Sequence, residues 1–258
     1  MDGWLFSTKH LSGLSVAVVF LTAFFVAFHF FNRSMNERQK LYVLRVIAGT
    51  MIFLEFWKMV LTIAHLGIIG YGQFPFHLCS MPLVLYPLVA FGKEKTRRIF
   101  APAAFIIGIA AGAITLAYPS NVLDVTIPWF RNMGINYPMH SFIYHTLMVV
   151  FAGYMIQSKI YKIKAIDFVY AAGIMLCLAC IAMVLNALIP GADYFMLGHG
   201  YGMPTQGIIE AAGLPVYIIT MMAIGIGVVF LIYSYWIFLA LVRAINKKGN
   251  EKAKRLSV

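Results

Sequence analysis

A histidine and a cysteine lie two residues apart in the stretch FPFHLCSMPL, residues 74–83. A cysteine thiolate is a strong nucleophile and a neighbouring imidazole can take the thiol proton, so His77 and Cys79 are candidates for covalent catalysis. The same side chains are acceptable metal ligands, and a cysteine also packs well in an apolar segment. Catalysis, metal binding and packing are therefore the three interpretations to separate.

Two further histidines occur in PMHSFIYH, residues 138–145. His140 and His145 are five residues apart, about 140° around an α-helix, so they diverge and are not expected to act as a tight pair. Either could serve as a general base. Either could instead form a hydrogen bond to a neighbouring helix and stabilise a bundle.

A glutamate and a lysine lie about one helical turn apart in EFWKM, residues 55–59. Each alone would cost about 2.5–3.5 kcal/mol at the centre of a bilayer, so Glu55 and Lys58 are expected to pair or to face a polar interior. A structural ion pair and a functional relay both remain open. We expect Asn186 to form hydrogen bonds between helices, and we include Tyr194 among the candidate residues of a polar pocket.

The elements that carry these residues are apolar helices. The 258-residue chain is 62% hydrophobic and 11% charged, with a mean hydropathy of +0.84, which excludes an ordinary soluble protein. About 20 helical residues cross a bilayer, and the apolar runs lack the short alternation of barrel strands. The sequence predicts an all-α polytopic membrane protein, one domain of seven transmembrane helices at about residues 11–32, 44–68, 75–92, 99–118, 138–158, 165–189 and 214–243.

The basic residues predict an orientation in the membrane. Seventeen of the 20 follow spans one, three, five and seven, which places the amino terminus outside and the carboxyl terminus, with a basic tail at 244–258, in the cytoplasm. The net charge of +11 then reflects topology and anionic lipid rather than nucleic acid. No cleavage site follows the first run, so we expect it to remain as a span.

In this orientation, every histidine except His29 lies toward the outer side, so we expect a functional centre to face outward. Two long connections, residues 119–137 and 190–213, are rich in Pro, Gly and aromatic residues and could cap it. Cys177 and Cys180 are interpreted as small packing residues within span six. No lysine in span seven could form a retinal Schiff base, and no acidic residue near the histidines could orient them on zinc. We therefore expect neither a metal nor a cofactor.

Several stretches together carry a family resemblance: PFHLCS, GIAAGAITLAYPSNVL, HSFIYHTLMVV, LNALIPGADYFML and GLPVYI. In this order they resemble the YwaF-like bacterial integral membrane family and, more distantly, the animal transmembrane protein 164 family, over about residues 50–235. The resemblance implies a seven-helix membrane protein. For the animal branch it implies a lipid acyltransferase with an acylated cysteine and a histidine, which would be Cys79 and His145, with His77 and His140 as neighbours.

Three functions follow as hypotheses. The first is an acyltransferase or lipid hydrolase of a bacterial plasma membrane, in which Cys79 and His145 act on a phospholipid or lysophospholipid. The second is a small-solute transporter or binding protein whose outward pocket uses Glu55, Lys58 and the histidines. The third and least favoured is a zinc enzyme. The oligomeric state is left open.

Overall fold

The computed structural model describes residues 5–67, 74, 76–119, 129, 138–199, 205 and 207–256, except for the side chains of 65, 66 and 247–256. This part of the chain contains helices and connections and no β-strand. Its α-helices are α1 (Thr8–Phe31), α2 (Glu37–Leu66), α3 (Pro82–Phe91), α4 (Glu94–Ile106), α5 (Gly112–Ala117), α6 (Pro138–Gln157), α7 (Asp167–Leu188), α8 (Gly207–Ala212) and α9 (Leu214–Leu256). The predicted all-helical fold is confirmed.

Six stretches are long and apolar enough to cross a membrane. They are Thr8–Phe31, Glu37–Ala64, Glu94–Ala117, Pro138–Gln157, Asp167–Leu188 and Leu214–Asn246. The third expected span, residues 75–92, corresponds to the shorter apolar segment Leu78–Phe91. The span expected at 99–118 is longer, because α4 continues through a π-helical turn, η3 (Ile107–Ala111), into α5. The chain is therefore an integral membrane protein by the length and composition of its helices.

Local chemistry explains where several of these helices begin and end. Asn36 and Gln39 form a reciprocal capping box at the start of α2, and Gly67 ends α2 in the left-handed region at φ 71°. Helix α3 begins at Pro82, whose missing N–H is no loss in a first turn. A start at Pro75 was expected, and that residue lies outside the described part. Cys79 therefore belongs to a 3-10 turn, η2 (Leu78–Ser80), that precedes α3.

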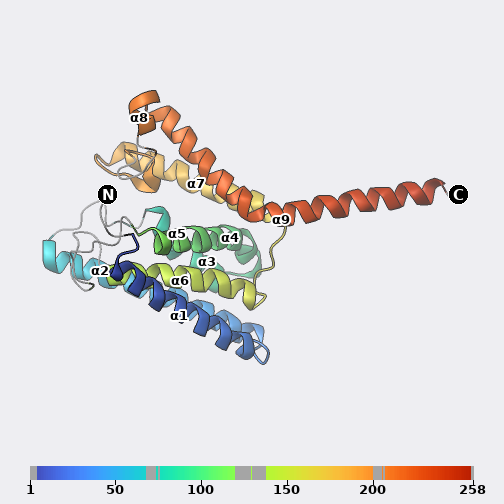
Figure 1. Cartoon of the computed structure of the whole chain (residues 1–258), viewed down its shortest axis with the longest axis horizontal. Coiled ribbons are helices and arrows are strands. Elements are labelled where there is room, and N and C mark those ends of the chain that lie inside the picture. Colours follow the sequence, from blue (N-terminus) through green and yellow to red (C-terminus); the bar gives the residue numbers. More distant parts are fainter. Residues whose placement is uncertain are drawn as a thin grey trace.

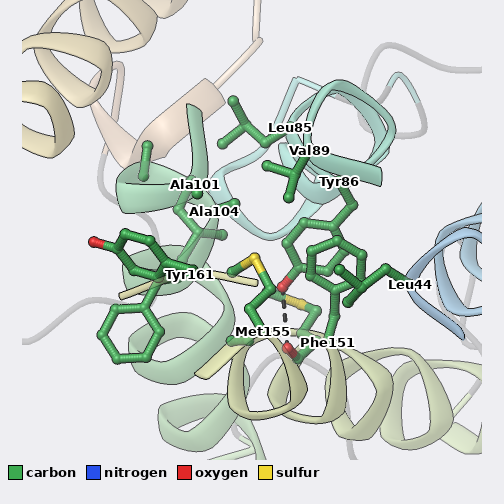
Figure 2. Close-up of a cluster of buried hydrophobic side chains, with 14 of the residues drawn as sticks. Leu44, Leu85, Tyr86, Val89, Ala101, Ala104, Phe151, Met155 and Tyr161 are labelled. Atoms are coloured by element: carbon green, nitrogen blue, oxygen red, sulfur yellow. Dashed lines mark hydrogen bonds between the residues drawn. The ribbon is translucent and has the colours of Figure 1, made fainter. Parts of the chain in front are cut away.

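The centre of the bundle is a close contact between α3, η3 and α6 (Figure 2). The Tyr86 ring stacks on Phe151 with centroids 3.8 Å apart, and its hydroxyl donates to the Met148 carbonyl at 3.0 Å. Gly108 makes this approach possible, since a Cβ there would lie 2.5 Å from both the Tyr86 hydroxyl and the Ala152 Cβ. In lipid, such close packing replaces the hydrophobic effect as the force that holds helices together.

Helices α7, α8 and α9 lie to one side of the bundle of α1–α6 (Figure 1). Near the α6–α7 connection, the Tyr161 hydroxyl donates to Asp167 and lies 2.9 Å from the Tyr233 hydroxyl, which donates to the Pro102 carbonyl of α4. Burial, together with Tyr233 and Asp167, raises the pKa of Tyr161, so it stays a neutral donor. This network ties α9 to α4. Helix α9 continues through most of the expected basic tail at 244–258, as far as Leu256.

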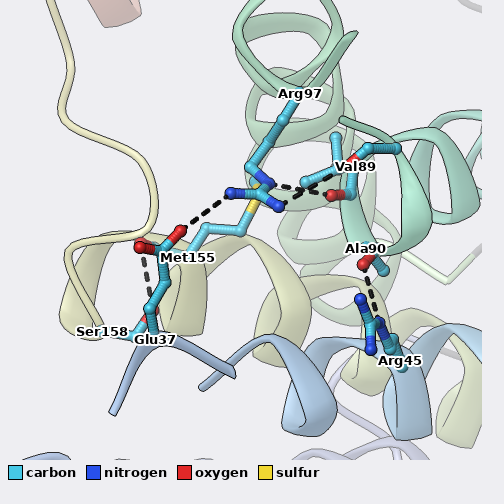
Figure 3. Close-up of polar contacts among 8 residues, drawn as sticks. Glu37, Arg45, Val89, Ala90, Arg97, Met155 and Ser158 are labelled. Atoms are coloured by element: carbon cyan, nitrogen blue, oxygen red, sulfur yellow. Dashed lines mark hydrogen bonds and ion pairs between the residues drawn. The ribbon is translucent and has the colours of Figure 1, made fainter. Parts of the chain in front are cut away.

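The three short connections that follow α1, α3 and α6 lie at one end of the bundle (Figure 1), and because they are rich in lysine and arginine we call it the basic end. Here the short helix α3 is capped by side chains from its two neighbours (Figure 3). Arg45 of α2 donates to the Ala90 carbonyl at 3.1 Å. Arg97 of α4 donates to the carbonyls of Val89 and Gly92. Both arginines satisfy carbonyls that the end of a helix leaves without partners, so they fix the position of α3.

Replacing Gly108 tests the central contact. Gly108→Ala should destabilise the protein by about 1–3 kcal/mol, because the new methyl group meets backbone and side-chain atoms that cannot move away cheaply. Gly49→Ala in α2 is the matched control, since nothing lies within 4 Å of its added Cβ. Melting temperatures of the purified variants in detergent measure the difference. Equal melting temperatures would contradict the packing described.

Candidate functional site

The ion pair expected in α2 is present. The Lys58 ammonium lies 2.5 Å from Glu55 Oε1, and the two side chains are only 11% and 7% exposed. Both residues lie on one face of α2, toward the helix end remote from the basic end. A buried ion pair costs desolvation free energy that its own attraction only partly offsets, so further polar partners are expected around it.

The first such partner is His140, in the first turn of α6. Its Nε2 lies 3.9 Å from Glu55 Oε2, and its ring faces the Leu54 carbonyl of α2. The Glu55 carboxylate thus pairs with a lysine on its own helix and lies near an imidazole on another, although His140 Nε2 forms no hydrogen bond with any described residue. Three titratable groups from two helices meet here, an arrangement within membrane spans that typically marks a functional site.

Tyr144 is a member of this cluster that the sequence analysis missed. Its ring stacks on that of His140 with centroids 5.7 Å apart, and its hydroxyl lies within electrostatic range of Glu55 and Cys79. The side chain is 4% exposed, and no group in the described ranges forms a hydrogen bond with the hydroxyl. A usable signal was present, because residues four apart share a helix face and Tyr144 follows His140 by four.

His145 is buried on α6 and held in a single tautomer. Its Nδ1 lies 2.7 Å from the Ser141 carbonyl. A carbonyl only accepts, so Nδ1 carries the hydrogen and Nε2 keeps its lone pair. His145 therefore presents the form of imidazole that can take a proton. Its ring lies beside that of Tyr144, with centroids 5.8 Å apart.

Cys79 is half-buried in η2, at the start of the short apolar segment. Its thiol is close enough for the charges of Lys58 and Glu55 to act on it, and these two charges have opposite effects on its ionisation. Between the described residues, no hydrogen bond joins Cys79 to His140 or His145. The pairing of Cys79 with His145 therefore stays a prediction.

His77, Asn186 and Tyr194 form a second group beside η2. The rings of His77 and Tyr194 meet edge to face with centroids 5.3 Å apart. Asn186 Nδ2 donates to the Tyr194 carbonyl, and the Tyr194 N–H donates to Asn186 Oδ1 at 2.8 Å. Asn186 thus holds the turn η4 (Tyr194–Met196) that follows its own helix, whereas we expected a hydrogen bond between spans. Through Tyr194, this part of the 190–213 connection contacts the His77 side of the site.

The other sequence candidates have structural or surface positions. His10 is buried and fully bonded, since its Nε2 donates to the Leu116 carbonyl and its Nδ1 accepts from the Phe6 N–H. We expected Cys177 and Cys180 to be small packing residues. Both are instead exposed on the surface of α7. The structured ranges contain no cluster of three His, Cys, Asp or Glu side chains suited to a metal. Most of the 119–137 connection lies outside the described residues.

The shared charge of Glu55 can be tested by a double-mutant cycle. Glu55→Gln should destabilise the protein by about 3–5 kcal/mol, because it leaves Lys58 buried without a counter-charge. Glu55→Gln with Lys58→Met should recover much of the loss, since no unpaired charge remains. Glu37→Gln is the control, because that carboxylate is 73% exposed in its pair with Arg97. Additive losses in detergent melting experiments would show that the two side chains are not coupled.

Comparisons with known proteins place the chain in a family. No curated protein and no solved structure matches it. The model of the TMEM164 family matches residues 5–233, which include every residue of the site. The match agrees with the relationship that the motifs suggested and extends it toward the amino terminus. The chain belongs to the TMEM164 family.

Proposed function

We propose that the protein is a membrane acyltransferase or lipid hydrolase that uses Cys79 as its nucleophile. One observation carries the proposal: the Cys79 thiol, the buried Glu55–Lys58 pair and Tyr144 of the histidine-bearing helix α6 lie close enough for their charges to act on one another. Burial and Glu55 oppose ionisation of the thiol whereas Lys58 favours it, so a base must take the thiol proton to give the thiolate that attacks an ester. Membership of the TMEM164 family supports this choice through the activity that the resemblance implies.

The reaction begins when Nε2 of His145 takes the thiol proton. Cys79 Sγ then attacks an acyl ester of a phospholipid, so that a C–S bond forms and the ester C–O bond breaks. The leaving lysolipid oxygen receives the proton from the His145 imidazolium. In the second half, a lysolipid hydroxyl or water attacks the thioester and gives its proton to His145. A C–O bond forms, the C–S bond breaks, and His145 returns the proton to the Cys79 sulfur. The Tyr144 hydroxyl, which bonds no group among the described residues, is a donor suited to the charged oxygen of the tetrahedral intermediates.

The proposed setting is a bacterial plasma membrane. Leu78–Phe91 would complete seven passes, with the amino terminus outside and the basic end in the cytoplasm, which agrees with the excess of lysine and arginine at that end. A chain of YwaF-like type would then present Cys79 and the α6 histidines to the outer leaflet. His77 and Tyr194 would border the entrance for the lipid.

Acyl labelling of cysteine tests the enzyme. Wild-type protein in nanodiscs that contain an alkyne-tagged phospholipid should acquire a label that hydroxylamine removes. Cys79→Ala should lose the label, whereas Cys177→Ala and Cys180→Ala, which alter exposed cysteines of α7, should keep it. His145→Gln should slow labelling by about 10²–10⁴-fold, the usual effect of losing a general base. Undiminished labelling of a Cys79→Ala protein with the wild-type melting temperature would remove Cys79 from the mechanism.

A proton-coupled transporter is the second candidate, and the shared Glu55 carboxylate favours it. A glutamate between a lysine and a histidine inside a bundle is an arrangement that proton relays use. In proteoliposomes with an imposed pH gradient and an internal pH dye, this function predicts that Glu55→Gln abolishes proton flux and Cys79→Ala preserves it. If the wild-type protein is acylated at Cys79 and carries no proton flux, the result supports the enzyme and excludes the transporter.

A further inference from the structure

A cavity of about 250 Å³ opens at the basic end, between the start of α2 and the connection that follows α6. Glu37 and Lys40 of α2 form one side of the cavity. The other side is formed by residues of the α6–α7 connection, namely Ser158, Lys159, Ile160 and Lys162. We call this cavity the basic-end pocket. It joins two segments about a hundred residues apart in the sequence, so it is a product of the fold.

The pocket has a strong positive charge. Three lysines line it, and its one acidic residue, Glu37, already faces Arg97, with Oε1 and Nη1 3.3 Å apart (Figure 3). The start of α2 adds to this charge. Its capping box satisfies the N–H groups of Asn36 and Gln39, and the positive end of the helix dipole lies at this start, where Glu37 partly offsets it.

The backbone of the α6–α7 connection is shaped to place its lysines there. Lys159 adopts a φ of 63°, a left-handed conformation that costs free energy in any residue with a Cβ. Hydrogen bonds hold it, from the Lys159 N–H to the Ile156 carbonyl and from the Tyr161 N–H to the Met155 carbonyl, both 3.0 Å long. The chain therefore turns back over the end of α6 and brings Lys159 and Lys162 to one opening.

The location of the pocket identifies the ligand chemistry. The spans Thr8–Phe31, Glu37–Ala64, Pro138–Gln157 and Asp167–Leu188 each have one end next to the connections of the basic end, where headgroups would lie in the proposed orientation. Basic pockets between spans are typical binding sites for anionic headgroups. A volume of about 250 Å³ is below that of sites for drug-sized ligands and suits a phosphate with a short glycerol fragment, beside the apolar wall of Ile160.

We propose that the basic-end pocket binds a phosphate group of the kind carried by anionic phospholipids such as phosphatidate. Lysines at this face also follow from the orientation of the chain, but orientation alone makes every basic residue of the face equivalent. The proposal differs, because it singles out Lys40, Lys159 and Lys162. It is independent of the chemistry proposed for Cys79.

Native mass spectrometry of the full-length chain in neutral detergent tests the site with dioctanoyl phosphatidate as the probe. One molecule should bind per chain, and dioctanoyl phosphatidylcholine should bind more weakly. Lys40→Gln and Lys162→Gln should each weaken phosphatidate binding about fivefold, as expected for one cation near an anionic headgroup. Lys95→Gln in α4 is the matched control, with the same change of charge at the same end but outside the pocket.

Competition by inorganic phosphate separates the two sources of the group. Displacement of phosphatidate at low millimolar phosphate would assign the pocket to a soluble phosphate, and retention would assign it to the lipid. The proposal is overturned if Lys95→Gln weakens binding as much as the pocket variants. It is also overturned if the combined Lys40→Gln and Lys162→Gln protein, with an unchanged melting temperature, binds phosphatidate as the wild type does.

Discussion

The contact of Tyr86 with α6 is the interaction on which the rest of the structure depends. Helix α3 has only ten residues, and on its own it is too short to hold a fixed depth in a bilayer. Tyr86 fixes it by stacking on Phe151 and bonding the Met148 carbonyl, in the space that Gly108 leaves open. Because η2 precedes α3 and the histidines precede Met148 on α6, this one contact also sets the distance between Cys79 and the imidazoles.

Burial of charge is the second constraint, and it explains the composition of the site. Glu55 and Lys58 neutralise each other on α2, yet a bare pair in lipid is poorly compensated. His140 approaches from α6, and Tyr144 places a hydroxyl within range. These neighbours do not satisfy one another fully, because His140 Nε2 and the Tyr144 hydroxyl form no hydrogen bond with any described residue. The same gathering concentrates proton acceptors and a thiol in one place, which is the requirement for acyl transfer and for proton coupling alike.

The two ends of the bundle have different chemistry. One end carries the thiol, the α6 histidines and the turn η4 that Asn186 holds against His77. The other carries arginines that cap α3 and lysines that line a cavity. Arg97 takes part in both features of the basic end, because it donates hydrogen bonds to carbonyls at the end of α3 and to the Glu37 carboxylate. Arg97 partly offsets the charge of Glu37, the acidic residue of the pocket, so the three lysines leave the pocket with a net positive charge.

Hydropathy and spacing were enough to predict the helices, the membrane and the Glu55–Lys58 pair, since these depend on neighbours within one turn. Tyr144 was within reach of the same rule, through its spacing from His140. Other features required the tertiary structure, because they depend on how helices rotate against one another. Examples are the Tyr86–Met148 bond across 62 residues and the meeting of His140 with Glu55. The sequence by itself determined which segments are apolar enough to span a membrane and toward which end the polar groups collect. Only packing decided which of those groups touch. The reason is that helix contacts in lipid follow local shape and hydrogen bonds rather than hydrophobicity.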